Sequence, residues 1–464
     1  MDSTREALAP LLAQMNPWWR GDAIPDLPTW HRTAYRELWE WVSSPPAPRA
    51  LLVSGARQVG KTTLLLQAIH QLLKTGVSPS QILYATFDHP LIKAAGPEAV
   101  LQAWRELEPS SGSPEYLFLD EAQFIPHFSV WVKHQVDFVR SRRIFFTGSA
   151  TPLLETDPES GVGRWHTLTL SPLSFYEYLQ IKKIALPSIP KPTPWTPHNT
   201  QLLTSAAHIL TGHFHEFLIR GGYPQTVLME SITQAQRFLR EDILDKVLKR
   251  DMTSLFGVRR IQELEQTFIY LCMHNGGLLD LGTLSQNMGI SKPTVQSFLE
   301  LLEAAHLLYQ LPPYGYGKEI LRARYKYYLA DPSLSPAILI KGKTPLEDPE
   351  QLGQLAEGAV ITHLIAYART TQARVSFWRN AKDREVDLVF DRGGALTPIE
   401  IKYRINPSKK ELQGLLDFCE IKKPALAYLV TKSPDAIGPS KQGPWISIPA
   451  PLFCYWLGES TPFL

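Results

Sequence analysis

The chain has 464 residues, of which 44% are hydrophobic, and a formal net charge of +2. This length exceeds what one hydrophobic core usually supports and predicts about three domains, or four if some are small. The small net charge gives little support for nucleic-acid binding by bulk charge, so such a function must depend on local patterns. Every apolar run is far shorter than the roughly 20 residues that cross a bilayer, so we expect no membrane span.

The N-terminus and the cysteines indicate the compartment. Residues 2–6 carry charges among alanines and leucines and lack the basic, apolar and small-residue order of a signal peptide, so we expect a cytoplasmic protein. Cys272, Cys419 and Cys454 lie far apart and form no CxxC pair. They support neither a disulfide framework nor a zinc site and are expected to be buried.

The first part of the chain alternates short β-rich runs with helical stretches over residues 51–149. Apolar strands separated by helices indicate a parallel sheet covered on both faces, which predicts a nucleotide-binding α/β core at residues 1–169. A helical pattern follows over 170–260. The proline-rich stretch 186–197 interrupts it and cannot be helical, so it is interpreted as a loop or linker inside a helical lid.

Three helical patterns follow over residues 261–310. Gly289 marks a tight turn, Ser291 is a plausible N-cap, and Pro293 falls in the first turn of the next helix. This arrangement is typical of a helix-turn-helix, which we place at residues 261–335. Beyond it, one helical pattern and several strand patterns predict a separate α/β domain at residues 336–464.

A phosphate-binding loop is predicted at Gly55–Thr62, whose sequence GARQVGKT matches GxxxxGK[ST] between a strand and a helix. Glycines let backbone N–H groups surround phosphate oxygens, and the helix N-terminus adds its positive dipole. Lys61 is expected to reach the terminal phosphates and Thr62 to bind Mg²⁺, with ATP as the nucleotide. The expected nucleotide-binding residues are Gly55, Ala56, Arg57, Gln58, Val59, Gly60, Lys61, Thr62, Thr63 and Ser149.

Two acids end the apolar run YLFLDEAQ. Asp120 is expected to support Mg²⁺ together with Thr62, and Glu121 to polarise the attacking water as a base. The run IFFTGSA ends in Thr147 and Ser149, which either contact the γ-phosphate or water or serve a strand-end turn. Arg164 is a candidate for a charge-stabilising arginine, with a surface arginine as the alternative.

An ordered set of motifs extends over nearly the whole chain: NPWW (16–19), GARQVGKTT, LFLDEAQ, FTGSAT, GRW, LSPLSFYEY, GGYP (221–224), EVDLVF and PIEIK. This set resembles the prokaryotic AAA-type (AAA+) P-loop ATPase family whose C-terminal domain has no known function. The resemblance implies an α/β protein with an AAA+ core, a helical lid, a winged helix-turn-helix and a terminal domain similar to the restriction-endonuclease (PD-(D/E)xK) fold. The proline-rich insert departs from the compact lid of that family.

A second candidate site combines Asp387 with Glu400 and Lys402, which share one face of a strand because they are two residues apart. This is the D…ExK pattern of Mg²⁺-dependent nucleases, in which carboxylates hold the metal and lysine orients the nucleophile. Glu357, on the preceding helix, resembles the helical acid of the family and would complete the ligands Glu357, Asp387 and Glu400. Alternatively, an exposed strand or a metal-free fold produces the same pattern.

Nucleic-acid contacts are predicted on the helix that follows Ser291, at Lys292, Thr294 and Gln296. The stretch after it interleaves aromatic and basic residues, which suits stacking on bases and neutralisation of phosphates. These residues are Tyr314, Tyr316, Tyr325 and Tyr327 with Lys318, Arg322, Arg324 and Lys326. A protein-binding winged helix or a half-buried wing would show the same pattern. We favour DNA over RNA as the partner.

These features favour an ATP-driven DNA-processing enzyme whose nucleotide state repositions the winged helix and the nuclease-like domain. The alternative is a regulatory or scaffold ATPase with a catalytically inactive C-terminal domain. A metabolic kinase explains less, because a small P-loop kinase needs no DNA-binding module. Homo-oligomer formation through the AAA+ core stays open, and protein partners are not indicated.

Overall fold

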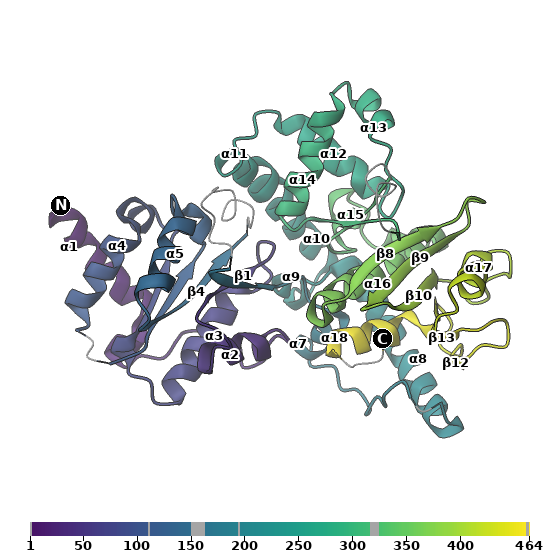
Figure 1. Cartoon of the computed structure of the whole chain (residues 1–464), viewed down its shortest axis with the longest axis horizontal. Coiled ribbons are helices and arrows are strands. Elements are labelled where there is room, and N and C mark those ends of the chain that lie inside the picture. Colours follow the sequence, from purple (N-terminus) through teal and green to yellow (C-terminus); the bar gives the residue numbers. More distant parts are fainter. Residues whose placement is uncertain (1, 110–111, 150–162, 194, 316–323, 461–463) are drawn as a thin grey trace. The chain divides into compact units, whose positions relative to one another are not determined.

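The computed structural model describes residues 2–109, 112–149, 163–193, 195–315, 324–460 and 464 (Figure 1). The chain forms two compact units, which are described separately. The first contains residues 1–170 with the short segments 254–257 and 304–306, and the second contains the remainder. The three segments predicted at 170–260, 261–335 and 336–464 belong mainly to the second unit.

The first unit is a parallel sheet covered by helices, as predicted. Its strands are β1 (Ala50–Ser54), β2 (Ile82–Thr86), β3 (Glu115–Asp120), β4 (Arg142–Gly148) and β5 (Trp165–Thr169), in the order β2-β3-β4-β1-β5. Its helices are α1 (Asp2–Met15), η1 (Pro17–Arg20), α2 (Tyr35–Ser43), α3 (Lys61–Lys74), η2 (Pro79–Gln81), α4 (Pro90–Leu107), η3 (Ala122–Phe124) and α5 (Phe128–Phe138). Alternate strand residues such as Leu52, Leu117 and Phe146 share a buried core with α1, α4 and α5.

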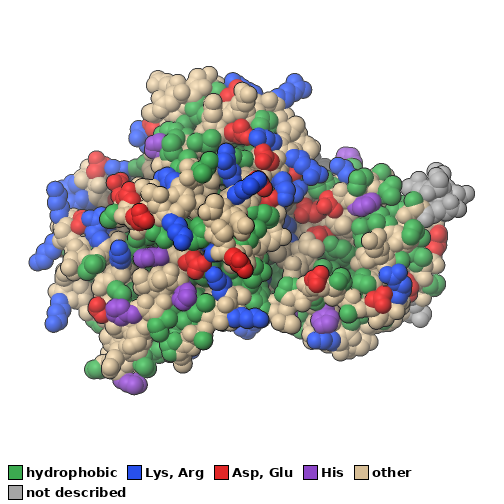
Figure 2. Space-filling model, turned by 180° about the vertical axis from the view of Figure 1, so that it is seen from behind, with side chains coloured by type: hydrophobic (Ala, Val, Ile, Leu, Met, Phe, Trp, Pro, Cys, Tyr) green, Lys and Arg blue, Asp and Glu red, His purple; other side chains and the backbone are tan. Residues whose placement is uncertain are grey.

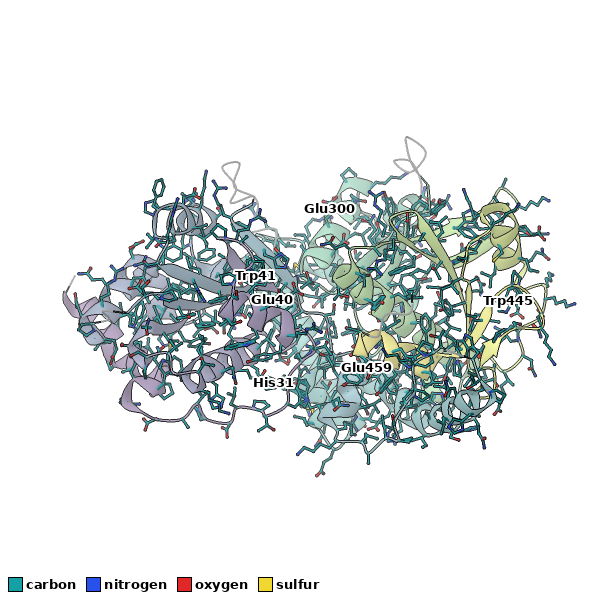
Figure 3. The ribbon with its side chains drawn as sticks, turned by 60° about the horizontal axis from the view of Figure 1, so that its bottom comes forward. His31, Glu40, Trp41, Glu300, Trp445 and Glu459 are labelled. Atoms are coloured by element: carbon teal, nitrogen blue, oxygen red, sulfur yellow. The ribbon has the colours of Figure 1, made fainter. Side chains whose placement is uncertain are left out.

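The β2 edge of this sheet is covered, which matters because an open strand edge invites pairing with other chains. At β2, the Asn16 side chain accepts a hydrogen bond from the Tyr84 N–H (2.7 Å) and donates to the Tyr84 carbonyl (2.9 Å). At β5, Trp41 of α2, labelled in Figure 3, stacks on His166 with 4.9 Å between ring centroids. The Asn-Pro-Trp-Trp motif thus has a structural role at the edge of the sheet.

The second unit contains a six-stranded mixed sheet. Its strands are β8 (Arg374–Arg379), β9 (Glu385–Arg392), β10 (Ala395–Lys402), β11 (Tyr428–Thr431), β12 (Gly438–Pro439) and β13 (Ile446–Pro449), in the order β12-β13-β11-β10-β9-β8. Helices α16 (Pro349–Thr371), α17 (Gln413–Lys422) and α18 (Ala450–Glu459) accompany it. Trp445, labelled in Figure 3, shares a buried cluster with Leu415 of α17 and Leu429 of β11.

The same unit contains the helices predicted for the lid and the helix-turn-helix. They are α7 (Phe175–Ile181), α8 (Pro197–Arg220), α9 (Pro224–Leu228), α10 (Ile232–Arg240), the π-helix η4 (Glu241–Asp251), α11 (Met252–Ser254), α12 (Ile261–Met273), α13 (Leu281–Met288) and α14 (Lys292–Ala304). Strands β6 (Leu308–Leu311) and β7 (Lys326–Leu329) form an antiparallel pair, and α15 (Leu334–Ile338) and η6 (Thr344–Leu346) follow. Gly289 adopts φ +64° after α13, and the Ser291 hydroxyl accepts from the Thr294 N–H at 3.3 Å. The predicted turn and cap are confirmed.

The proline-rich stretch behaves largely as predicted. Its described residues before Pro197 form no helix, and Pro197 itself begins α8. The Trp195 ring lies beside Gly438 of β12, where an added Cβ atom would be 3.7 Å from it. The insert therefore lies against the edge strand of the six-stranded sheet.

The motifs LSPLSF and GGYP meet at a buried carboxylate. The Leu173 N–H donates to the Gly222 carbonyl (2.6 Å), and the Gly222 N–H donates to Asp331 (2.8 Å). Gly221 adopts φ +84°, and a Cβ atom there would lie 2.1 Å from the Ser333 hydroxyl. Only glycine fits such a position, so these motifs join α7, α8 and the segment after β7.

Two further expectations concern the described residues. Cys272, Cys419 and Cys454 are buried and unpaired, as predicted. Within the described ranges, no helix combines the length and the apolar character that crossing a bilayer requires.

We predict that Asn16→Ala loosens the β2 edge, because it leaves two backbone groups of Tyr84 without partners. Each unsatisfied buried group costs about 1–3 kcal/mol. Hydrogen–deuterium exchange of the peptide containing residues 82–86 should therefore become at least about tenfold faster, since about 1.4 kcal/mol corresponds to a factor of ten. Asn406→Ala, at an exposed position, is the control. Unchanged exchange in Asn16→Ala would refute the proposed role of the side chain.

Candidate functional sites

The phosphate loop connects β1 to α3, as predicted. Gly60 adopts φ +97°, which favours glycine, and an added Cβ atom on Gly55 would lie 2.3 Å from the Leu170 carbonyl oxygen. Lys61 begins α3 and is buried, and its ammonium donates to the carbonyls of Gly55 (2.9 Å) and Ala56 (2.8 Å). The lysine thus lies across the loop that the sequence predicts to hold phosphates.

The remaining predicted loop residues differ in exposure. Ala56 and Val59 are buried, whereas Arg57, Gln58 and Thr63 are partly exposed. The Val59 carbonyl accepts a hydrogen bond from the buried Arg32 guanidinium at 2.7 Å. Arg32 therefore fixes the loop from outside the motif, which the sequence pattern did not indicate.

Asp120 is the centre of a hydrogen-bond cluster at the end of β3. Thr62 donates to its Oδ2 (2.7 Å), Tyr84 donates to the same oxygen (3.0 Å), and Thr147 donates to Oδ1. Burial raises the pKa of Asp120 and neighbouring Glu121 adds to this, while the three hydroxyl donors act in the opposite direction. The predicted pair of Thr62 and Asp120 is in contact, and Tyr84 is an additional member.

Glu121 is held beside this cluster in a left-handed backbone conformation, with φ +55°. Its N–H donates to the Thr147 hydroxyl (2.9 Å), and its carboxylate accepts from the Gln123 amide, which also donates to Ser149 (3.0 Å). Thr147 therefore contacts both acids, and Gln123 links the predicted base to Ser149. The Gln123 role was missed, although the residue lies within the DEAQ motif.

Arg164 is not near the phosphate loop, so its predicted role is wrong for the loop of the same chain. It precedes β5, and its carbonyl accepts from the N–H of Ala50, the first residue of β1. The loop follows Ser54 at the other end of that strand, about 13 Å away at roughly 3.3 Å per residue. The Arg164 guanidinium instead pairs with Asp137 at 2.6 Å, as the surface-arginine alternative allows.

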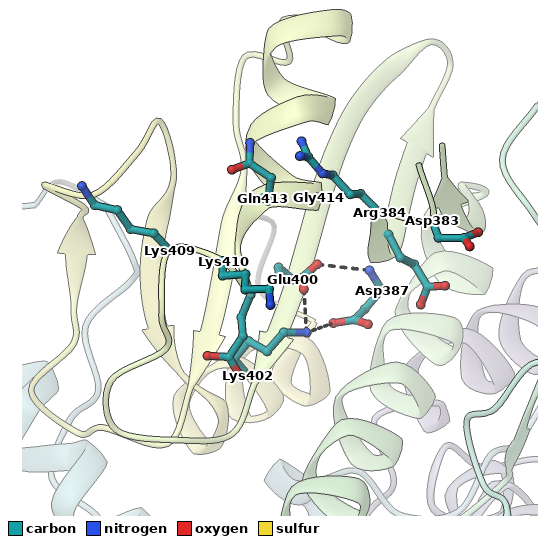
Figure 4. Close-up of a pocket in the computed structure, with 11 residues that line it drawn as sticks. Asp383, Arg384, Asp387, Glu400, Lys402, Lys409, Lys410, Gln413 and Gly414 are labelled. Carbon is teal, nitrogen blue, oxygen red and sulfur yellow. Dashed lines mark hydrogen bonds and ion pairs between the residues drawn. The ribbon is translucent and has the colours of Figure 1, made fainter. Parts of the chain in front are cut away.

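The second site lies on β9 and β10, which pair antiparallel (Figure 4). Lys402 is 2.6 Å from Glu400 Oε1 and 3.4 Å from Asp387 Oδ2, and Asp387 also accepts from the Ile401 N–H at 2.8 Å. Both carboxylates are buried. The three predicted residues therefore converge, and they line a cavity of about 540 Å³.

Other elements complete this site. Glu357 of α16 accepts a hydrogen bond from the Tyr328 hydroxyl of β7 at 2.9 Å. Lys326 of β7 pairs with Glu385 and lies 4.0 Å from Asp387 Oδ1. Lys326 and Tyr328 are therefore site residues that the sequence pattern did not identify.

The prediction that Lys326 and Tyr327 contact nucleic acid is wrong, because both are buried on β7. Successive side chains of a strand point to opposite faces, and all four residues of β7 are buried, so both faces of this strand are covered. The lysine faces carboxylates rather than solvent. Arg324 is exposed and pairs with Asp280 at 2.9 Å. Tyr316, Lys318 and Arg322 lie outside the described residues.

Burial controls the charges of the second site. Burial, followed by repulsion from Asp387, raises the pKa of Glu400 to about 8 and that of Glu357 to about 7. Burial alone would raise the pKa of Asp387, but Lys402 and Lys326 lower it below its usual value. The site therefore holds one firmly ionised carboxylate and two that ionise with difficulty.

The acids of both sites are candidate ligands for Mg²⁺. Over the described ranges, no three or more His, Cys, Asp and Glu side chains are grouped so that they could hold a metal ion. At the second site, the Lys402 ammonium bridges Asp387 and Glu400. The oxygen donors of both sites nevertheless have the chemistry that Mg²⁺ prefers. Metal binding by Asp387, Glu400 and Glu357 stays a prediction.

Three family models match successive segments of the chain. Residues 47–179 match an AAA domain, residues 211–344 match a domain of unknown function (DUF8612), and residues 352–453 match another (DUF4143). The first match, the parallel sheet and the GxxxxGKT loop together define a P-loop ATPase fold of the AAA type.

Two relatives match most of the chain, and both are described as uncharacterized proteins. The chain is 26% identical to an uncharacterized protein of Haemophilus influenzae over 79% of this chain and 85% of that protein. It is 22% identical to an uncharacterized protein of Methanocaldococcus jannaschii over 70% of each.

Two solved structures align with the chain, both with low TM-scores. The RuvB Holliday junction branch migration motor of Thermotoga maritima has 15% identity and a TM-score of 0.27, covering 67% of this chain and 90% of that one. Cdc6p from Pyrobaculum aerophilum has 14% identity and a TM-score of 0.30, covering 70% and 96%. TM-scores this low support no comparison of sites.

We predict that Glu400→Gln flattens the pH dependence of stability. Because the folded-state pKa is raised above the usual value of 4.5, the folded chain binds a proton between about pH 5 and 8 that the unfolded chain releases. Stability of the wild type should therefore fall as the pH rises through this window. Thermal unfolding in EDTA at pH 5, 6.5 and 8 measures the slope, with exposed Glu420→Gln as control. Equal slopes for wild type and Glu400→Gln would contradict the prediction.

Proposed function

We propose that the chain binds Mg²⁺·ATP at Gly55–Thr62 and hydrolyses it. The observation that carries this proposal is the 2.7 Å hydrogen bond that brings Thr62 of α3 to Asp120 of β3, beside Lys61. Thr62 and Asp120 are the residues that would hold Mg²⁺, which when bound supplies positive charge next to the phosphates. Lys61 exchanges its contacts with loop carbonyls for contacts with phosphate oxygens.

Glu121 is the proposed general base. Its carboxylate accepts a hydrogen bond from the Gln123 amide, which also donates to the Ser149 hydroxyl. Glu121 would accept a proton from the attacking water, while Gln123 holds the Glu121 carboxylate in position.

We predict that Lys61→Ala reduces ATP hydrolysis at least about 100-fold. Glu121→Gln should retain nucleotide binding but lose about 100-fold in rate, the lower range for removing a general base. Phosphate release from purified full-length protein in Mg²⁺ measures the rate, and fluorescent ATP measures binding. Glu106→Gln, an exposed change on α4, should keep the wild-type rate. Hydrolysis that survives Lys61→Ala would exclude this loop as the site.

We further propose that the second unit binds DNA through a winged helix built from α12, α13, α14 and the strand pair β6–β7. Lys292 at the start of α14 is exposed, as is Arg324 before β7. Thr294 and Gln296 hydrogen-bond to Ser291 and Glu300, so they are less suited to the contacts first expected. In Figure 2, Lys and Arg side chains are interspersed with Asp and Glu, so binding would depend on local contacts.

The third part of the proposal is Mg²⁺-dependent phosphodiester cleavage at Asp387, Glu400 and Lys402, coupled to the nucleotide state. Its support is their convergence on one cavity. Asp387 and Glu400 are the residues that would hold the metal, and Lys402 would orient the attacking water. The alternative is a regulatory or scaffold ATPase whose second unit is catalytically inactive.

We predict that Asp387→Asn and Lys402→Met each reduce DNA cleavage by at least 100-fold without altering ATP hydrolysis by more than about twofold. Single- and double-stranded DNA and RNA are tested with Mg²⁺ or Mn²⁺, with and without ATP. Asp383→Asn, an exposed residue that lines the same cavity, is the charge-matched control. Absence of cleavage by the wild type under all conditions would favour the scaffold alternative.

A further inference from the structure

The cavity of the second site combines buried acids at its floor with a rim of mixed charge, shown in Figure 4. Asp387 and Glu400 lie at the floor with Lys402. The other charged residues that line the cavity are the basic Arg384, Lys409 and Lys410 and the acidic Asp383, Glu385 and Glu411. Acids alone would repel an anionic ligand, so the cations of this rim determine whether such a ligand can enter.

The rim lysines stand on a turn fixed by hydrogen bonds. The N–H and hydroxyl of Ser408 donate to Glu411 Oε2 at 2.8 and 2.7 Å, and the Glu411 N–H donates back to Ser408 at 3.4 Å. Arg404 pairs with the other carboxylate oxygen of Glu411 at 2.6 Å. The backbone that carries Lys409 and Lys410 is therefore held in place without their side chains.

The start of α17 rests directly on β9. A Cβ atom added to Gly414 would lie 1.9 Å from the Glu385 carbonyl oxygen, so only glycine permits this approach. The close contact keeps the turn at residues 408–411 beside the strand that carries Asp387. The lysines are thus positioned at the mouth of the cavity by packing of the backbone.

The three basic side chains of the rim differ in their hydrogen bonds and ion pairs. Arg384 makes two 2.9 Å contacts with Asp417 and is oriented by them. Lys409 and Lys410 are exposed, and no ion pair or hydrogen bond engages their ammonium groups within the described parts of the chain. Two adjacent cations without internal partners are available for an external anion.

We propose that the Lys409–Lys410 turn binds the phosphate backbone of a single nucleic-acid strand and guides it to Asp387 and Glu400. This inference rests on the proposed cleavage function and names its substrate class. A cavity of about 540 Å³ has the size of a small-ligand pocket, which suits a short stretch of one strand better than a duplex. The lysines neutralise phosphates next to the one that reaches the acids.

The test is fluorescence anisotropy of a labelled twelve-nucleotide oligothymidylate with full-length protein in EDTA, between 50 and 200 mM salt. Lys409→Ala/Lys410→Ala should raise Kd about tenfold and reduce the slope of log K against log salt by about 1.4, since each phosphate contact on a single strand contributes about 0.7. Lys423→Asn/Lys441→Ala removes two exposed charges of the same unit and should change Kd by less than about twofold.

Three results would overturn the inference. One is an unchanged Kd and salt slope in the Lys409→Ala/Lys410→Ala protein with ATP hydrolysis intact. Another is weakened binding only in Lys292→Ala/Arg324→Ala, which would assign the contacts to the helix-turn-helix. The third is displacement of the oligonucleotide by inorganic phosphate at equal phosphate concentration, which would indicate a site for the free ion.

The result of this binding test can be distinguished from the result of the cleavage test. If the wild type binds the strand through this turn but never cleaves it, the cleavage proposal fails and the binding site stands. If the wild type cleaves and the double variant cleaves with unchanged KM, the binding site fails and the cleavage proposal stands.

Discussion

The candidate nucleotide site of the first unit is organised around one hydrogen bond, from the Thr62 hydroxyl to Asp120. It joins the first turn of α3 to the end of β3, although β4 separates β3 from β1 in the sheet. The bond is possible because parallel strands end at the same edge, so residues from distant parts of the chain meet there. Thr147 from β4 and Tyr84 from β2 reach the same carboxylate for the same reason.

The second unit achieves convergence by antiparallel pairing. Leu388 lies opposite Ile399, and therefore Asp387 lies opposite Glu400. Burying several carboxylates is costly unless cations accompany them, and two lysines from different strands supply that charge. Lys402 is on the same strand as Glu400, whereas Lys326 comes from the β6–β7 pair. The strand pair proposed as the wing is thus also a wall of the acid site.

The two sites could be predicted from the sequence to different depths. Gly55–Thr62 is a local motif, so its position between β1 and α3 could be predicted from adjacent residues, whereas the Arg32 contact with Val59 could not. Glu400 and Lys402 were predicted to share a face because a strand alternates with a period of two. Their partner Asp387 required only the pairing of neighbouring strands.

The predictions were wrong or incomplete where strand register, or packing between residues far apart in the sequence, determines the position of a side chain. The Arg164 prediction failed because the alignment of β5 with β1 determines which end of the sheet it occupies. Lys326 was misassigned because the same sequence of alternating tyrosines and cations occurs on solvent-exposed and on buried strands. Lys409 and Lys410 gave no signal, since only the backbone contact at Gly414 brings their turn to the cavity.

The central claim is that Thr62 and Asp120 form the metal side of a nucleotide site. The most direct measurement is a structure of the full chain with Mg²⁺ and a non-hydrolysable ATP analogue. If Thr62 and Asp120 hold the metal, Mg²⁺ should contact the Thr62 hydroxyl beside Asp120, and the Lys61 ammonium should contact the terminal phosphates. Nucleotide bound elsewhere, or phosphates in the loop with Thr62 and Asp120 remote from the metal, would contradict the account.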